Sequence, residues 1–219
     1  MARIVITGAN RGIGLALARH YAGRGDQVIA AVRETSEPLS ELDVALHQGI
    51  DVTDDVSVSA FAGSLGEPVD VLINNAGILL RGGLDDPDWD GMRRQFEVNT
   101  LGPLRMTRTL LPHLREGSKV AIVTSRVGSL GDNGSGGNYG YRMSKTAVNM
   151  IGVNLSIDLK PKGIPVILLH PGMVRTDMVS APSAVDPAHS ASGLVARIDE
   201  LTLDNTGRFM HAEGYELPW

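Results

Sequence analysis

The chain has no cysteine, so it can form neither disulfide bonds nor thiolate metal sites, although this leaves its cellular compartment open. Its histidines lack the H-x-x-x-H or similar spacing of metal ligands, so we expect no metal. The formal net charge is −5 and no basic face is evident, which argues against a nucleic-acid partner. No apolar run approaches the length of a membrane span and no secretory signal is visible. We therefore expect a soluble cytoplasmic protein with no membrane partner.

The chain also lacks any sign of a second domain, since no Pro/Ser-rich linker, charge block or internal repeat interrupts it. Its 219 residues suffice for one sizeable hydrophobic core. Short apolar, β-branched runs alternate with helix-like segments along the whole chain. This pattern predicts an α/β fold, a doubly wound parallel sheet with right-handed crossovers, in a single domain that spans residues 1–219.

What the chain does contain is a pair of residues at helical spacing, Tyr141 and Lys145. Residues four apart share one face of a helix, and an apolar stripe runs from Tyr141 towards Lys160 before Pro161 and Gly163 end the helix. A free phenol titrates near ~10, but a neighbouring ammonium group lowers that pKa towards the range of general acid–base catalysis. Taken alone, the spacing also describes a surface tyrosine beside a solvated lysine.

A second motif lies near the N-terminus, where the apolar run Arg3–Thr7 leads directly into Gly8, Gly12 and Gly14. The run predicts a buried parallel strand, and the apolar positions after Gly14 predict a helix. This is the context of a dinucleotide site, because glycines let the backbone approach a pyrophosphate and the helix N-terminus offers unpaired N–H groups. The alternative is an ordinary glycine-rich turn.

Six segments follow one another along the chain: residues 7–14 (Thr-Gly-Ala-Asn-Arg-Gly-Ile-Gly), 74–77 (Asn-Asn-Ala-Gly), Asn99, Ser125, Tyr141 with Lys145, and Pro171 with Gly172. In this order they resemble the short-chain dehydrogenase/reductase family. More narrowly, residues 31–33, 125–129 and 138–145 are similar to its carbonyl-reductase and C-factor-like branch. The resemblance runs from Arg3 to about Asp177 and resumes over residues 207–219. It implies a Rossmann-type sheet of seven strands in the order 3-2-1-4-5-6-7, with the last strand near residues 207–211.

The resemblance also implies catalytic roles for four side chains. Tyr141 is expected to protonate the carbonyl oxygen, and Lys145 to lower the pKa of Tyr141 and to bond the nicotinamide ribose. Ser125 is expected to hydrogen-bond the substrate oxygen, with Ser129 as the alternative hydroxyl nearby. Asn99 is expected to kink its helix and to hold a water molecule for a proton relay.

Residues that contact the cofactor are implied in the same way. Asp51 is expected to meet the adenine amino group, although it would also suit the N-cap of a helix that starts near Asp54. The segment 74–77 is expected to touch the adenosine ribose, although an Asn/Gly turn forms without a cofactor as well. Thr176 is expected to bond the nicotinamide carboxamide, whereas His170 is interpreted as structural. The full set is Gly8, Asn10, Arg11, Gly12, Ile13, Gly14, Arg33, Asp51, Val52, Asn75, Ala76, Gly77, Tyr141, Lys145, Pro171, Gly172, Val174 and Thr176.

The choice between NAD and NADP depends on the end of the second predicted strand, residues 27–32. NAD-specific sites place an acidic side chain there to bond the ribose 2′-hydroxyl. In this chain Val32 and Arg33 occupy that place, and Asp26 lies at the wrong end of the strand. Arg33 and Arg11 carry the planar guanidinium group that suits a 2′-phosphate. We therefore expect NADP(H); the alternative is that both arginines are simply solvated.

Two segments that we expect to border the substrate depart from the family's usual form. The loop 131–137 is glycine-rich and lengthens the connection from Ser125 to Tyr141, so it is expected to order on binding. The substrate lid, around residues 177–206, is short and polar. The predicted pocket walls are mostly apolar and favour an aldehyde or ketone with hydrophobic substituents: Leu79, Leu80, Leu130, Tyr139, Met173 and Met178.

These inferences predict an NADP-dependent oxidoreductase that reduces a small-molecule aldehyde or ketone to an alcohol by hydride transfer, with Tyr141 as proton donor. The alternative is a dinucleotide-binding signalling or sensor protein of the C-factor type with incidental turnover. An epimerase or dehydratase of the extended branch is disfavoured by the short C-terminal portion and the glycine spacing. Family members often form a homodimer or homotetramer through the Tyr/Lys helix and residues 89–114, yet some carbonyl reductases are monomers.

Overall fold

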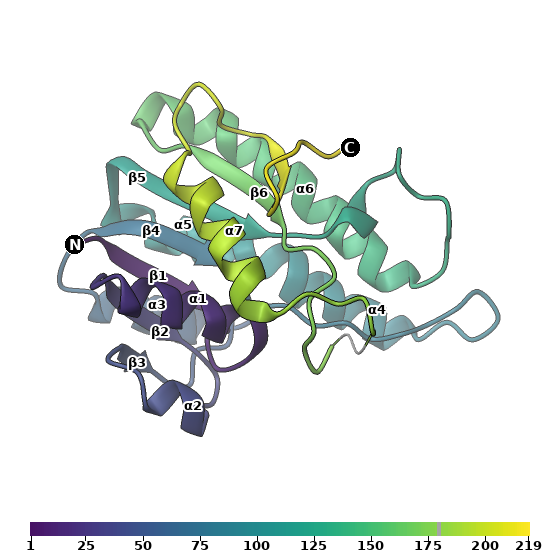
Figure 1. Cartoon of the computed structure of the whole chain (residues 1–219), viewed down its shortest axis with the longest axis horizontal. Helices are drawn as coiled ribbons and strands as arrows, with labels where there is room; N and C mark the ends of the chain where they lie inside the picture. The colour runs from purple at the N-terminus through teal and green to yellow at the C-terminus, as the bar shows by residue number, and fades with distance from the viewer. Residues whose placement is uncertain (179–180) are drawn as a thin grey trace.

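The core of the protein is a seven-stranded sheet in which every pair of neighbouring strands is parallel. The computed structural model describes residues 1–178 and 181–219 (Figure 1). The strand order is β3-β2-β1-β4-β5-β6-β7, so the predicted order and the predicted doubly wound, single-domain α/β fold are confirmed. The strands are β1 (Arg3–Thr7), β2 (Gln27–Ala31), β3 (Ala45–His47), β4 (Val69–Asn74), β5 (Leu114–Val123), β6 (Val166–His170) and β7 (Phe209–His211).

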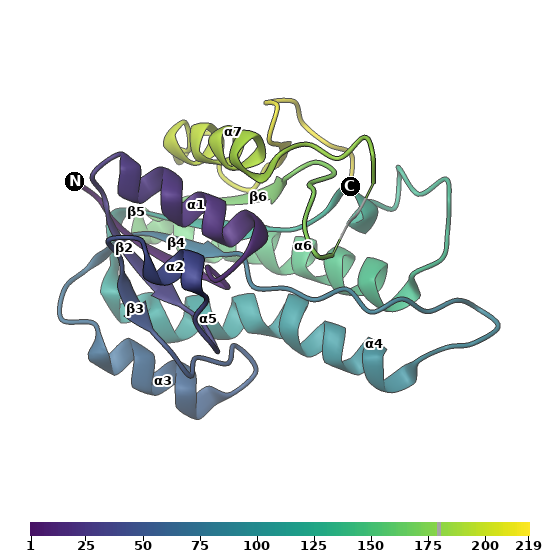
Figure 2. The same ribbon diagram turned by 60° about the horizontal axis from the view of Figure 1, so that its bottom comes forward.

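Helices cover both faces of this sheet. Figure 2 shows α1 and α7 on one face and α3, α5 and α6 on the other. The helices are α1 (Gly12–Gly23), α2 (Glu37–Ser40), α3 (Asp55–Ser64), α4 (Trp89–Phe96), α5 (Gly102–Leu110), α6 (Tyr139–Leu159) and α7 (Pro187–Asp199). A π-helical turn (Glu97–Leu101) and short 3₁₀ turns (Leu111–His113, Arg126–Gly128 and Lys160–Lys162) complete the described elements.

Two hydrophobic layers hold the helices on the sheet. Leu17 and Tyr21 of α1 pack with Leu194 of α7 on one face. Met106 of α5 and Val148 of α6 pack on the other face. Because both faces are covered, the strands carry runs of consecutive apolar residues rather than an alternating pattern.

The parallel sheet brings the motifs together at the carboxyl ends of its strands. The glycine turn follows β1, the Asn-Asn-Ala-Gly turn follows β4, and Ser125 and Pro171 follow β5 and β6. In an open parallel sheet, ligands bind beyond the carboxyl ends of the strands where the strand order reverses. That point lies between β1 and β4 here, because β2 extends the sheet on one side of β1 and β4 extends it on the other.

Two elements are irregular. The edge strand β3 is short and pairs with β2 alone. In the segment 89–114, the π-helical turn Glu97–Leu101 separates α4 from α5 and contains Asn99, the residue expected to kink its helix. A wider turn of this kind frequently marks a functional site. None of the helices in the described part of the chain is long and apolar enough to cross a membrane.

Candidate active site

The glycine turn after β1 leaves room for a phosphate group. Gly8 and Gly12 have positive φ angles of 66° and 53°, which side chains with a Cβ rarely adopt. A Cβ on Gly14 would lie 2.2 Å from the Gly8 carbonyl oxygen, so only glycine fits there. No acidic residue occupies the first turn of α1 and the Arg11 side chain does not cap it. The N–H groups of Gly12, Ile13 and Gly14 at the positive end of the helix dipole therefore suit an anion such as a pyrophosphate.

The Asn-Asn-Ala-Gly turn braces this glycine turn. The Asn75 amide donates to the carbonyl oxygens of Thr7 and Gly8, at 3.0 and 3.1 Å. The Thr7 hydroxyl accepts from the backbone N–H groups of Asn75 and Ala76, both at 3.0 Å. Gly77 lies further into the site, where an added Cβ would be 3.7 Å from the Lys145 ammonium nitrogen. The turn thus connects the glycine-turn side of the cleft to the predicted catalytic side.

The structure brings Ser125 and Tyr141 together at the end of β5. Burial raises the pKa of the Tyr141 phenol to about 12, and the neighbouring Ser125 hydroxyl, a hydrogen-bond partner, opposes this rise. The neutral phenol is therefore favoured in this protein without cofactor, which suits a proton donor. Ser129, the alternative hydroxyl, is buried and instead accepts from the Asp132 N–H at 3.1 Å.

Lys145 lies one helical turn after Tyr141 and is almost completely buried, with 5% of its surface exposed. Its ammonium group donates to the Val123 carbonyl oxygen at 3.0 Å and lies 5.7 Å from the centre of the Tyr141 ring. Burial lowers the pKa of Lys145 to about 8. The expected lowering of the Tyr141 pKa by Lys145 is not seen here, because burial sets the direction of the shift in both groups.

Asn99 occupies the π-helical turn and is buried with its amide fully engaged. Its oxygen accepts from the Ile78 N–H at 2.8 Å, and its nitrogen donates to the Ile78 carbonyl at 2.9 Å. The same nitrogen donates to the Ser144 hydroxyl at 3.0 Å, which in turn donates to the Tyr141 carbonyl at 2.8 Å. Asn99 therefore ties the turn after β4 to the Tyr141 turn of α6.

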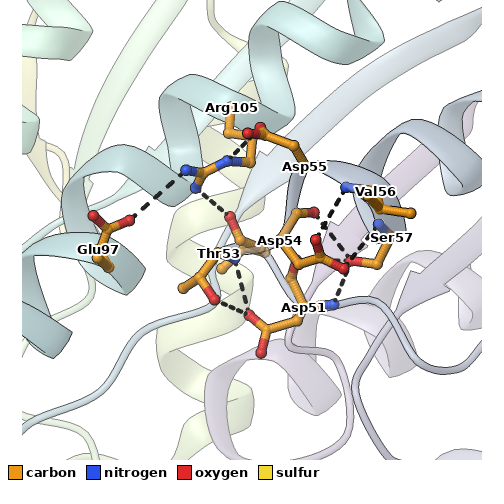
Figure 3. Close-up of polar contacts among 9 residues, drawn as sticks. Asp51, Thr53, Asp54, Asp55, Val56, Ser57, Glu97 and Arg105 are labelled. Carbon is orange, nitrogen blue, oxygen red and sulfur yellow. Dashed lines mark hydrogen bonds and ion pairs between the residues drawn. The ribbon is translucent and has the colours of Figure 1, made fainter.

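The segment after β3 is held by its own polar contacts (Figure 3). Asp51 accepts from the N–H and the hydroxyl of Thr53, at 2.9 and 2.7 Å. Burial disfavours the charged carboxyl, but these bonds and the charges of Arg33 and Arg94 outweigh it, so the pKa of Asp51 is lowered. Asp51 is not the helix cap: Asp54 caps α3 by accepting from two backbone N–H groups.

The segment after β6 approaches the glycine turn. An added Cβ on Gly12 would lie 3.1 Å from the methyl carbon of Thr176. Arg11 forms an exposed ion pair with Asp177 at 3.0 Å, which links the glycine turn to the start of the lid. An isolated bridge joins Val174, in the segment after β6, to Val185 of the predicted lid. Residues 179–180 of the predicted lid lie outside the described residues.

Tyr139 and Leu130 do not lie where the substrate mouth was expected. They line a groove of about 430 Å³ on the outer side of α6, together with Met143 and Met150, and none of the four predicted catalytic side chains lines it. The helix explains the difference, because Tyr139 precedes Tyr141 by two residues and so lies on another face. The predicted walls Leu79, Leu80 and Met178 are partly buried, and Met173 is half-exposed.

His170 is a structural residue in this arrangement. Its ring packs edge-on against His211, with ring centres 5.0 Å apart. Burial, with a smaller contribution from neighbouring positive charges, lowers the pKa of His170 to about 3, so the ring stays neutral. Among the described residues, no group of three or more His, Asp or Glu side chains could hold a metal ion.

Several residues that position the site were not predicted. Ser144, Gln95 and Asn149 are buried polar residues with bonds to Tyr141, to Leu80 and to Thr124 respectively. The sequence offers one signal that could have identified such residues, a polar residue at a position where the helix is expected to face the core. Their partners, however, are distant in sequence and could be identified only in the fold.

Comparison with known proteins gives the family. The model of the short chain dehydrogenase family matches residues 2–185. The chain belongs to the short-chain dehydrogenases. A relative, 1-hydroxy-2-glutathionyl-2-methyl-3-butene dehydrogenase of Rhodococcus sp. (strain AD45), is 44% identical over 226 residues and is matched over the whole of both chains. C-signal of Myxococcus xanthus is 51% identical over 156 residues, 69% of this chain and 93% of that protein.

The solved structures agree with this short-chain dehydrogenase assignment. The NADPH-bound carbonyl reductase from chicken fatty liver superposes with a TM-score of 0.92 at 29% identity, over 100% of this chain and 99% of that one. The resemblance to the carbonyl-reductase and C-factor-like branch is thereby confirmed. So is the prediction of an oxidoreductase.

The buried charge of Lys145 predicts a pH-dependent cost in stability. The native pKa of about 8 lies below the ordinary 10.5, so the cost is fully present below pH 8 and disappears as pH rises towards 10.5. Lys145→Met should therefore raise the free energy of unfolding of the cofactor-free protein at pH 7 by roughly 2 kcal/mol. Urea unfolding at pH 7 and pH 10 measures both values. Lys162→Met, at an exposed lysine, is the control, and a gain that persists unchanged at pH 10 would contradict the argument.

Proposed function

We propose that this short-chain dehydrogenase uses NADPH to reduce an aldehyde or ketone to an alcohol. The observation that carries the proposal is the convergence of Ser125, Tyr141 and Lys145 beside Gly77, at the open edge of a glycine turn shaped for a phosphate. When bound, NADPH supplies the hydride that is added to the carbonyl carbon. The remaining steps belong to side chains of this chain.

Tyr141 is the proton donor in this proposal. Its raised pKa keeps the phenol protonated until negative charge develops on the substrate oxygen, which then accepts the proton. The Ser125 hydroxyl is next to the phenol and orients the same oxygen. The ammonium group of Lys145 stabilises the phenolate that remains, since an opposite charge in a buried site favours the ionised form. Asn99 keeps the Tyr141 turn in place through the Ser144 hydroxyl.

The cofactor is proposed to be NADP(H) rather than NAD(H). Arg33 lies after β2, where an NAD-specific site would carry a carboxylate, and Arg11 lies in the glycine turn. The chicken carbonyl reductase, which superposes over this whole chain, was solved with NADPH bound. The remaining predicted contacts, from Asn10 to Thr176, are proposed to hold the cofactor as the family resemblance implies.

The substrate is proposed to be apolar around its carbonyl group, because the predicted walls Leu79, Leu80, Met173 and Met178 are apolar side chains. The dehydrogenase from Rhodococcus is named for a glutathione conjugate, so a panel of aldehydes, ketones and quinones is extended to glutathione-conjugated carbonyl compounds. Oxidation of the matching alcohols by NADP is assayed with the same panel.

Tyr141→Phe tests the chemistry. Because it removes the proton donor and leaves the cofactor cleft intact, kcat for NADPH-dependent reduction should fall by at least about 100-fold. The dissociation constant of NADPH, measured by fluorescence, should stay unchanged. Tyr139→Phe is the matched control, since this second tyrosine lies on another face of α6 and should retain full activity.

Tight NADPH binding without turnover of any carbonyl or alcohol would instead favour the second candidate, a dinucleotide-binding signalling protein. The observation behind that candidate is the 51% identity to C-signal of Myxococcus xanthus. The intact set of Asn99, Ser125, Tyr141 and Lys145 favours chemistry over a purely binding role.

Cofactor preference is tested at Arg33. Arg33→Ala should weaken NADPH binding roughly tenfold, because it removes a charge-assisted contact to the 2′-phosphate. NADH binding should change by less than about twofold, since NADH has no such phosphate. Calorimetric titration measures both constants, with Arg19→Ala, at an exposed arginine on α1, as control. Equal effects on the two cofactors would contradict the assignment.

The protein is also proposed to form a homodimer through the outer face of α6. Met143, Met150 and Ile157 recur every seven residues along this helix and are 51%, 62% and 64% exposed. Large apolar side chains in a continuous exposed row mark an interaction surface. This face is the one that the family resemblance implies for pairing.

Met150→Glu tests the dimer. A carboxylate in the centre of the row would have to be buried without a partner, so the variant should be a monomer in light scattering at concentrations where the parent chain is a dimer. Val56→Glu, at an exposed apolar residue on α3, should leave the mass unchanged. A monomeric parent chain would refute the proposal.

A further inference from the structure

Arg105 of α5 reaches away from its own helix to the segment after β3 (Figure 3). Its Nη1 donates to the Val52 carbonyl oxygen at 2.8 Å, and its Nε donates to the Asp55 carboxylate at 2.8 Å. Its Nη2 lies 3.7 Å from the Glu97 carboxylate, at the start of the π-helical turn. The side chain is only 17% exposed. One guanidinium group therefore joins the β3–α3 connection to the helix that carries Asn99.

The location of Val52 gives this contact a functional meaning. Val52 follows the edge strand β3, on the β2 side of the point where the strand order reverses. In an open parallel sheet that side of the crevice receives one half of a dinucleotide and the opposite side receives the other. The residues for hydride chemistry lie on the β4–β6 side, so the adenosine half falls beside Val52. This step depends on the proposed binding of NADP(H).

The segment 51–53 has few other restraints from distant parts of the chain. Asp51 and Thr53 bond each other, and Asp51 also bonds Ser57, all within one short stretch of sequence. These contacts shape the segment, and the residue before it is tied to the sheet by the Ile50 N–H, which donates to the Val32 carbonyl at 3.0 Å. Among the hydrogen bonds of the described residues, Arg105 provides the one from this segment to a helix other than the adjoining α3. Close packing of Val52 on Gly102, where an added Cβ would lie 2.9 Å from the Val52 side chain, supplements it.

We propose that Arg105 is a positioning residue for the adenine end of the cofactor: by holding the Val52 carbonyl, it keeps Asp51 and Val52 where they meet the adenine ring. Arg105 itself does not contact the cofactor. Its planar fork explains the residue type, because one guanidinium group binds a carbonyl and a carboxylate at the same time, whereas an ammonium group is a single point charge.

The affinities of the two halves of the cofactor, measured separately, distinguish this positioning role from a general effect on stability. Arg105→Met should weaken adenosine 2′,5′-bisphosphate and NADPH by roughly tenfold in calorimetric titrations. Reduced nicotinamide mononucleotide, which lacks the adenosine half, should bind the variant within about twofold of the parent chain. Arg105→Lys, which keeps the charge and loses the fork, should lie between the two. Arg108→Met, at an exposed arginine one helical turn away, is the matched control.

The outcomes separate this proposal from the proposed function. A parent chain that binds neither NADPH nor adenosine 2′,5′-bisphosphate overturns the proposed function, and this inference with it. A parent chain that binds both, with unchanged affinities in Arg105→Met, overturns this inference alone. Equal weakening of both cofactor halves assigns Arg105 a general structural role and also overturns it. If Arg105→Met does not fold, Arg105→Lys and Asp55→Asn decide between the same outcomes, since each removes part of the contact.

Discussion

The rest of the active site depends on how the buried ammonium group of Lys145 is held. A charge inside a protein is costly unless it is paired or hydrogen-bonded, and the contact described for this one is the Val123 carbonyl. That bond ties α6 to the end of β5 and thereby determines how far Tyr141 lies from Ser125. The same position requires close approach elsewhere: a Cβ on Gly128 would lie 2.7 Å from the Lys145 carbonyl carbon. The position of Lys145 therefore requires a residue without a side chain, Gly128, where the turn after β5 approaches α6.

The burial of Tyr141 and Lys145 shifts the pKa of both groups and costs the folded protein some stability. Burial moves the pKa of Tyr141 up and that of Lys145 down, to about 12 and about 8. Both shifts mean that the folded protein holds these groups in a medium that disfavours their charged forms. Such strongly perturbed, adjacent groups are typical of catalytic sites. In the proposed reaction, negative charge develops beside Tyr141. The nearby ammonium group of Lys145 then stabilises that charge.

The two ends of the cleft are mechanically connected through one helix. The α4–α5 segment carries Asn99 in its π-helical turn, and Arg105 follows on α5. Asn99 holds the turn after β4 and the Tyr141 turn of α6, while Arg105 holds the segment after β3. A single element therefore contacts both the Tyr141 turn of α6 and the segment after β3, which lie on opposite sides of the strand-order reversal.

The sequence by itself determined the alternation of strands and helices, the glycine turn and the helical spacing of Tyr141 and Lys145, because each of these rests on a local pattern of apolar runs, glycines or residues four apart. The strand order and the expected roles of Asn99 and Ser125 came from the resemblance to a family, carried by the order of six motifs along the chain. The tertiary structure decided what depends on distant partners. The Asp51 carboxylate bonds Thr53 while Asp54 caps the helix, and Tyr139 faces the outer groove rather than the substrate. Arg105 shows the physical reason. Its partners Asp55 and Val52 are 50 and 53 residues away along the chain. Sequence periodicity describes only residues that are close together in the chain, so it does not predict such contacts.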